Sequence, residues 1–192
     1  MNKKNINPKK NKNMENSTKV VTGKVRFSYV NVFEPKAVAE GETPKYSVCV
    51  MIPKTDKNTV DKINKAIEAA KQAGKSKIAD KNGKIPSNLK SPLRDGDIER
   101  EDDPAFEGHY FINAKSNYAP GVVDRNRNEI LDKNELYSGC YGRVSITFYA
   151  YNVSSKGIAC LLNNVQKLED GERMGGASSA EDDFSEDFDD LA

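Results

Sequence analysis

Residues 139–167 constrain the fold more than any other part of the chain, because their side chains alternate between apolar and polar types. The alternation runs over residues 139–152 and again over 158–167, and the turn-forming sequence Ser-Ser-Lys-Gly at 154–157 separates the two runs. Alternation with a period of two is typical of a half-buried strand, and a short turn between two such strands makes a hairpin. The sequence therefore predicts a long β-hairpin here.

The two faces of the first predicted strand differ in chemistry. Its even positions are apolar and are expected to face a core: Val144, Ile146, Phe148 and Ala150. Its odd positions carry rings, hydroxyls and one guanidinium, with no carboxylate: Tyr141, Arg143, Ser145, Thr147, Tyr149 and Tyr151. Aromatic rings on an open sheet face can stack unpaired bases for about 1–3 kcal/mol each while cations hold phosphates. Tyrosine also packs well when half-buried, so this strand alone leaves a packing role equally open.

Charge is distributed unevenly along the chain. The formal net charge is +1, but the last twelve residues hold seven acidic side chains and no basic one, which leaves 30 basic against 22 acidic residues elsewhere. A basic body favours a polyanionic partner, and an acidic tail would compete with that partner for the basic surface. The first 19 residues contain six lysines and one glutamate. They are too polar to offset the entropy of ordering them, so a disordered basic arm is predicted.

Composition divides the chain into three parts. Residues 1–19 are the predicted arm, residues 20–168 a folded domain, and residues 169–192 a flexible linker followed by the acidic tail. Five tail residues are candidates for docking a protein partner: Phe184, Phe188, Asp189, Asp190 and Leu191. Three widely spaced cysteines without the spacing of a metal site are expected to be reduced thiols of a cytoplasmic protein, and no apolar run is long enough to cross a membrane.

Further strands and one helix are predicted within residues 20–168. Alternation predicts strands starting at Val20 and covering 45–52 and 109–115, with Val21, Val25, Phe27 and Tyr29 sharing one face of the first. Asn58, with Asp61 three residues later, is expected to cap a helix that stops at Gly74. The less apolar strand faces add four candidate DNA-contacting residues: Lys24, Arg26, Phe111 and Lys115.

Two acidic segments suggest metal chemistry. The cluster between Asp95 and Asp103 could hold two Mg²⁺ ions in a nuclease, but it is contiguous in a polar segment rather than supplied by separate rigid elements. Residues 124–135 follow the acidic spacing of a calcium loop, yet Glu129 stands where the sharp turn needs glycine. We therefore expect a non-enzymatic protein without a metal or cofactor.

Four segments resemble a bacteriophage domain family long catalogued as of unknown function. They are residues 92–97, 108–114, 137–142 and 156–163, and the Ser-Gly-Cys-Tyr-Gly sequence at 138–142 is the most specific of them. The resemblance covers about residues 18–168. It implies a single-stranded DNA-binding protein with the oligonucleotide-binding (OB) fold, which is mainly β: a five-stranded Greek-key barrel with one α-helix.

The position of the helix leaves two arrangements open. The fold usually places its helix between the third and fourth strands, whereas only two strands are predicted before the helix here. Either residues 20–38 bend into two strands, or the helix is an insertion.

The residues and the resemblance together predict a protein that coats single-stranded DNA during phage replication or recombination in the host cytoplasm. Its phosphate contacts would be Lys24, Arg26, Lys115 and Arg143, and its stacking rings Phe111, Tyr141, Tyr149 and Tyr151. The tail is expected to inhibit DNA binding and to recruit replication or recombination proteins. It is similar in kind to the tails of bacterial and phage single-strand binders, although it ends on Leu-Ala instead of Pro-Phe.

The alternatives are a metal-dependent nuclease using the acidic cluster between Asp95 and Asp103, and an RNA-binding or annealing protein. A homodimer is left open.

Overall fold

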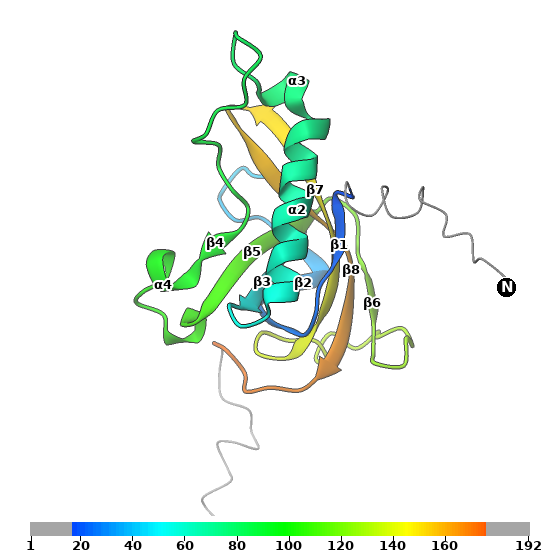
Figure 1. Cartoon of the computed structure of the whole chain (residues 1–192). Helices are drawn as coiled ribbons and strands as arrows, with labels where there is room; N and C mark the ends of the chain where they lie inside the picture. Colours follow the sequence, from blue (N-terminus) through cyan, green and yellow to red (C-terminus); the bar gives the residue numbers. More distant parts are fainter. Residues whose placement is uncertain (1–16, 176–192) are drawn as a thin grey trace, which may run out of the picture.

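One mixed β-sheet of eight strands organises the fold (Figure 1). In the computed structural model, which describes residues 17–175, the long strands are β2 (Val25–Lys36), β3 (Lys45–Pro53), β5 (His109–Ser116), β7 (Tyr141–Val153) and β8 (Ser155–Glu169). The short strands are β1 (Lys19–Val21), β4 (Arg94–Asp95) and β6 (Gly121–Val123). The prediction of a mainly β chain is confirmed, but the sheet has eight strands where five were expected, because three short strands extend it.

The pairings of the five long strands lead back to the strand where they begin. β2 pairs antiparallel with β3, β3 pairs antiparallel with β5, and β5 pairs parallel with β8. β8 pairs antiparallel with β7, which in turn pairs antiparallel with β2. The sheet therefore has an inner and an outer face. β1 adds to β7, β4 to β5 and β6 to β8.

The predicted hairpin is present and has a tighter turn than expected. β7 and β8 stay paired up to Val153 and Ser155, so that only Ser154 lies between the two strands. Ser154 has a φ of 59°, in the left-handed region that reverses the chain in one step. Residues 155–157, which were expected to form the turn, belong to β8 instead.

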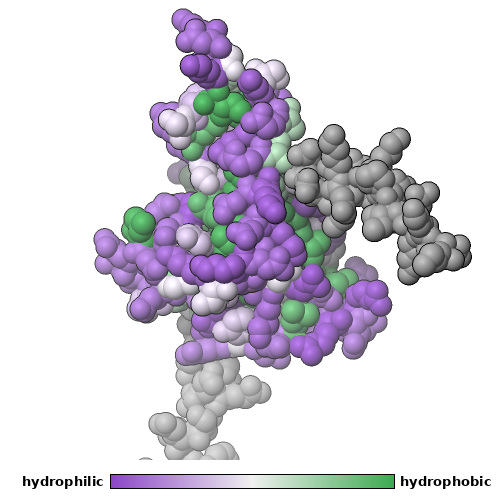
Figure 2. Space-filling model, in the orientation of Figure 1, coloured by the Kyte–Doolittle hydropathy of each residue, from purple (hydrophilic) through white to green (hydrophobic). Residues whose placement is uncertain are grey.

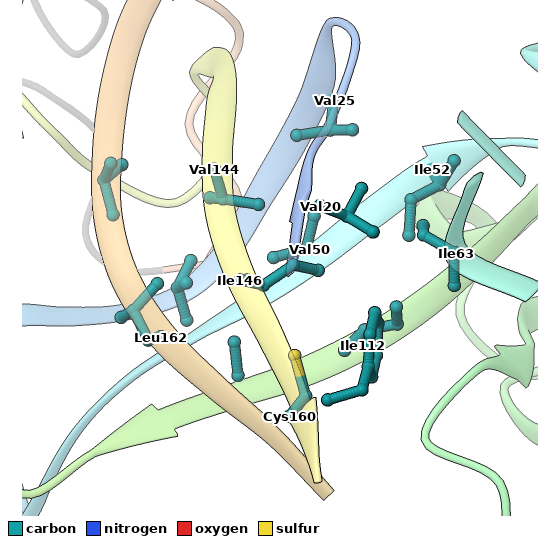
Figure 3. Packing of buried hydrophobic residues seen from close by; sticks show 14 of the residues in the cluster. Val20, Val25, Val50, Ile52, Ile63, Ile112, Val144, Ile146, Cys160 and Leu162 are labelled. Atoms are coloured by element: carbon teal, nitrogen blue, oxygen red, sulfur yellow. The ribbon is translucent and has the colours of Figure 1, made fainter. Parts of the chain in front are cut away.

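The main core lies between the inner face of the sheet and helix α2 (Lys57–Ala73). Figure 3 shows Ile146 of β7 beside Val50 of β3, and Ile63 of α2 beside Ile52 at the end of β3. The four even positions of β7 that were expected in the core are each at most 5% exposed. That part of the sequence prediction is confirmed.

Helix α2 begins earlier than predicted, because Asp56 caps it instead of Asn58. The Asp56 carboxylate accepts a hydrogen bond from the Thr59 backbone N–H at 3.1 Å. The helix ends where predicted, at Gly74, whose N–H donates to the Ala70 carbonyl. A side chain at this position would meet β7, since an added Cβ would lie 2.2 Å from the Cβ of Ala150.

Residues 20–38 contain most of the short strand β1 and all of β2, and among the five long strands α2 lies between the second, β3, and the third, β5. The first face predicted for this stretch is wrong at Val21 and Tyr29, which are 46% and 55% exposed, whereas Ser28 is buried. Tyr29 has a φ of 47°, and the pairing register with β3 shifts between Ser28 and Asn31. This bulge inverts the alternation at Tyr29, whereas Val21 belongs to a separate strand, β1.

The polar connection before β5 contains three short helical elements: α3 (Lys75–Ile78), α4 (Gly96–Glu99) and η1 (Pro104–Phe106).

Within residues 17–175, no helix combines the length and apolar character needed to cross a membrane.

Candidate nucleic-acid interface

The outer face of β2, β3 and β5 carries three rows of paired residues. The register sets Arg26, Met51 and Phe111 in the first row, Ser28, Cys49 and Asn113 in the second, and Asn31, Ser47 and Lys115 in the third. The first row is mostly apolar and the third is polar and basic. The face therefore changes character from one end to the other.

A second, smaller core covers the first row. Phe106 of η1 and Met174 pack against Met51 and Phe111, and the Phe106 and Phe111 rings meet edge to face with centroids 5.2 Å apart. Phe111 has no exposed surface. The prediction that Phe111 stacks a base is therefore wrong in this structure: alternation placed it on the less apolar side of β5, but η1 and Met174 cover that side here.

Two arginines lie over these aromatic rings. The Cζ of Arg94 is 4.7 Å from the Phe111 centroid, and the Cζ of Arg100 is 5.2 Å from the Phe106 centroid and 5.8 Å from that of Tyr29. Such distances are within the range of cation–π attraction. Arg94 is also paired with Glu99 at 2.5 Å, whereas Arg100 has no ion-pair partner within residues 17–175. Arg100 thus brings an unpaired charge beside the exposed Tyr29.

Next to the covered row the face opens into a groove of about 380 Å³. It is lined by Tyr29, Asn31, Lys36, Ala37, Val38, Ser47, Val48, Cys49, Arg100, Asn113 and Lys115, with no carboxylate among them. A contiguous hollow of about 320 Å³ shares Lys36 and Lys115 and adds Lys45 and one acid, Glu42. We call the two together the groove.

The charge of the groove is positive. Lys36, Lys45 and Lys115 are exposed, and within the described part of the chain none of them has an ion-pair partner. Burial raises the pKa of the Cys49 thiol to about 12, so this residue of the lining stays neutral at physiological pH. Exposed cations beside an exposed ring are what a phosphate backbone with unstacked bases requires.

Sequence reasoning found Lys115 but missed Tyr29, Lys36 and Arg100 as groove residues. The alternation puts Tyr29 on the same face as Val25 and Phe27, because the bulge is not visible in the sequence. Arg100 lies in a polar connection without periodicity, and the pairing of β4 with β5 brings that connection to this face.

Three other predicted residues, Lys24, Arg26 and Tyr141, are brought together at the covered end of the face. The Lys24 Nζ and Arg26 Cζ lie 5.7 and 5.6 Å from the Tyr141 ring centroid. Lys24 also pairs with Glu169 at 3.1 Å, and Arg26 donates to the carbonyl oxygens of Gly139 and Glu172. These cations are therefore already engaged within the protein.

The remaining predicted residues lie on the outer face of the hairpin. Arg143 is exposed, and its Nε donates to the Thr22 carbonyl at 2.9 Å. Tyr149 is 47% exposed, and Tyr151 is half-buried against Gly157. The hairpin face is continuous with the groove, because Lys115 of β5 pairs with Leu161 of β8.

Residues 170–175 fold back onto the domain instead of leaving it, and we call them the C-terminal strap. The Gly171 N–H donates to the Tyr137 hydroxyl at 3.2 Å, and the Met174 N–H donates to the Ser138 carbonyl at 2.8 Å. The Cζ of Arg173 lies 4.0 Å from the Tyr137 ring centroid. The strap thus ends beside the second core. The predicted docking residues Phe184, Phe188, Asp189, Asp190 and Leu191 lie outside the described residues, as does most of the predicted basic arm.

The acidic segment near Asp95 makes structural contacts. The Lys54 Nζ lies 2.5 Å from Asp95 and 2.7 Å from Asp97, and the second oxygen of Asp97 accepts the Gly108 N–H at 2.7 Å. The hydrogen bond from Lys54 lowers the pKa of Asp97. In residues 17–175 no three His, Cys, Asp or Glu side chains are grouped so that they could hold a metal ion.

The chain is similar to phage proteins. The profile of a family described as "Enterobacter phage Enc34, ssDNA-binding protein" matches residues 18–191. The chain is 30% identical over 180 residues to "Putative protein p50" of Acyrthosiphon pisum secondary endosymbiont phage 1, covering 91% of this chain and 94% of that protein.

Two solved structures have a similar fold. The single-stranded DNA-binding protein from bacteriophage Enc34 in complex with ssDNA is 29% identical with a TM-score of 0.70, over 82% of this chain and 90% of the other. The structure of gp2.5, a single-stranded DNA-binding protein encoded by bacteriophage T7, has a TM-score of 0.60 over 91% and 96% of the two chains. At 14% identity the second likeness concerns the fold alone.

Proposed function

The chain belongs to the family of the single-stranded DNA-binding protein of Enterobacter phage Enc34, and on this basis we propose that it binds single-stranded DNA in the groove. As a member of this family of DNA-binding proteins, it is not an enzyme. The observation that carries the proposal is the groove itself, which combines an exposed tyrosine with lysines that have no ion-pair partner in residues 17–175 and has a lining almost free of acidic residues.

We infer that the five long strands form an oligonucleotide-binding barrel. Their pairings return to the starting strand, and β5 and β8, the third and fifth of them, run parallel. In such barrels the face of the second and third strands binds oligonucleotides, together with the loops after the first and fourth strands. The equivalents here are β3 and β5, residues 37–44 and the hairpin turn at Ser154. The groove lies against β3, β5 and the start of the first loop.

Each groove residue has a role that its position supports. Tyr29 would stack a base, while Lys36, Lys45, Arg100 and Lys115 would hold phosphates. Arg143, Tyr149 and Tyr151 would extend the contact along the hairpin. Lys24, Arg26 and Tyr141 would contribute less, because their charges and ring already have partners in the protein.

The acidic tail would compete with DNA for the groove. Its seven acidic side chains carry the charge of a short polyanion. The strap supports this proposal, because it fixes Met174 against the second core, on the same face as the groove. The tail would also recruit replication or recombination proteins, and the protein would coat single-stranded DNA during those processes in the cytoplasm of an infected host cell.

A titration by fluorescence anisotropy tests the proposal. The full chain would be titrated without divalent metal against matched single-stranded DNA, duplex DNA and RNA at several salt concentrations. We expect preference for single-stranded DNA and an affinity that falls steeply with salt. Tyr29→Ala should weaken binding by roughly 5–150-fold, which corresponds to the 1–3 kcal/mol of one stacked base. Lys115→Ala should flatten the log-affinity against log-salt slope by about 0.7.

Two control variants make the result specific. Tyr29→Phe keeps the ring and should bind like the original chain, and Lys62→Ala removes an exposed lysine of α2 and should leave the slope unchanged. Arg143→Ala and Tyr149→Ala report on the hairpin in the same assay. Binding that is indifferent to Tyr29 and Lys115 would remove the groove assignment. Equal affinity for RNA would favour the RNA-binding alternative, and cleavage on adding Mg²⁺ the nuclease.

A further inference from the structure

A second basic surface lies at the end of the molecule where α3, residues 79–90 and the turn of the hairpin meet (Figure 1). Residues 75–90 contain five lysines and a single acid, Asp80. Together with one lysine of β8 they supply six cations, which we call the lysine end: Lys75, Lys77, Lys81, Lys84, Lys90 and Lys156. Figure 2 shows this end as mainly hydrophilic.

The charges of the lysine end are available to a ligand. The five lysines of residues 75–90 are exposed, and within residues 17–175 none of them has an ion-pair partner. Asp80 is occupied by the local chain, because its Oδ1 accepts the N–H groups of Asn82 and Lys84 at 2.8 and 2.9 Å. Among the described residues this surface therefore carries a net positive charge.

These lysines stand on a fixed support. Ile78 is fully buried, and Ile85 and Leu89 pack against the main core. The Lys156 Nζ donates to the Ala79 carbonyl at 2.8 Å, and the Ile158 N–H donates to the Lys90 carbonyl at 3.2 Å. A ligand would thus meet lysines whose backbone is already ordered, which lowers the entropy cost of binding.

The hairpin connects the lysine end to the groove. Lys115 at the groove pairs with Leu161 of β8, Tyr149 pairs with Ala159, and Gly157 pairs with both Tyr151 and Lys90. Paired residues point to the same side of a sheet, so this path runs along one outer face. The four residue-to-residue steps from Gly157 to Leu161 span about 13 Å at roughly 3.3 Å per residue. Two tyrosines therefore lie between the lysines of the groove and those of the lysine end.

We propose that the lysine end binds the phosphates of the same single strand after it leaves the groove, so that the DNA site is longer than the groove. This inference rests on the function proposed above. The strand would pass from Lys115 over the outer face of the hairpin beside Tyr149 and Tyr151. Binding at the lysine end would be electrostatic and independent of base sequence, because lysine contacts phosphate as a point charge.

The test compares two triple variants that remove the same charge. Lys77→Gln/Lys81→Gln/Lys84→Gln changes the lysine end, and Lys57→Gln/Lys62→Gln/Lys65→Gln changes the exposed side of α2. Both would be titrated, beside the original full chain, against oligonucleotides of about 4 and about 16 nucleotides, the range that one such fold covers. On the long oligonucleotide the first triple should flatten the salt slope by about 2, at about 0.7 for each lost phosphate contact. On the short one it should bind as the original chain does, and the second triple should change neither.

The outcomes separate this inference from the proposed function. If the original chain did not bind the short oligonucleotide, the groove assignment would fail. If it bound, and the first triple left the long-oligonucleotide slope unchanged or matched the second triple, only the lysine end would be refuted. Tighter binding by the first triple would instead show that these lysines hold the acidic tail, and would also overturn the inference.

Discussion

At the scale of single residues, Arg100 connects the second core with the groove. Its guanidinium lies within 5.8 Å of the ring centroids of Tyr29, Phe106 and Phe111, two of which are fully buried and one exposed. Each such contact is worth about 0.5–2 kcal/mol, depending on how far water is excluded. The same group can also pair with a phosphate. A substitution in the second core should therefore also change the position of Arg100 and Tyr29 in the groove.

Phe111 and Tyr29, a buried and an exposed ring beside Arg100, should differ in their contribution to stability. Phe111→Ala should lower the free energy of unfolding by about 3–5 kcal/mol, because it leaves a cavity under Arg94 and Arg100. Tyr29→Ala should lower it by only about 0.5–1 kcal/mol, because that ring is exposed and loses little more than its contact with Arg100. Urea denaturation followed by circular dichroism measures both. A Phe111→Ala protein that is as stable as the original would mean that the ring is not buried in solution.

At the scale of elements, the part predicted from the sequence is the part set by local pattern. The hairpin, the inward positions of β7 and the stop of α2 at Gly74 follow from periodicity and from the preferences of glycine. The bulge at Tyr29 depends on pairing between β2 and β3, and the cover over Phe111 comes from Met174 and from η1, a short element without strand or helix periodicity. Alternation carries no signal for them, which is why Phe111 and Tyr29 were assigned to the wrong environments.

In the candidate site, too, the residues in regular strands could be predicted and the others could not. Lys115 and Tyr149 lie in regular strands and could be identified from the sequence. Lys36 lies at the end of β2 and Arg100 in a connection without periodicity, so their place in the groove depends on how β2, β3 and β5 are assembled.

The start of α2 offers a direct comparison between two caps. Asp56→Ala should lower the free energy of unfolding by about 0.5–2 kcal/mol, since the Thr59 N–H loses its acceptor. Asn58→Ala should be nearly neutral or slightly stabilising, because Asn58 is an exposed residue inside the helix and alanine is the better helix former. Thermal unfolding of the two variants distinguishes them. A larger loss for Asn58→Ala would restore the cap that the sequence suggests.

At the scale of the whole molecule, the strap determines where the acidic tail begins. Removing residues 181–192 should tighten binding to single-stranded DNA, because an intramolecular competitor is lost. Coupling of this kind typically amounts to about 1–3 kcal/mol, or roughly 5–150-fold. The gain should shrink as salt rises, since charge interactions are screened over about 10 Å at 0.1 M.

A full-length variant with the seven acids of the tail changed to Asn or Gln is the control for chain length. It should bind like the shortened chain. Unchanged affinity in anisotropy titrations of both proteins would remove the competitor role and leave the tail with partner recruitment only.

The arrangement of the sheet also bears on how the protein behaves when crowded. A strand with unpaired backbone groups at the margin of a sheet can recruit the same strand of a neighbouring molecule and start aggregation. Here each of the five long strands pairs with at least two others, and the strands added outside them, β1, β4 and β6, are only two or three residues long. Many copies packed closely along one DNA strand would therefore offer each other little backbone to pair with. Such a coat could form at high local concentration and still come apart when the DNA is released.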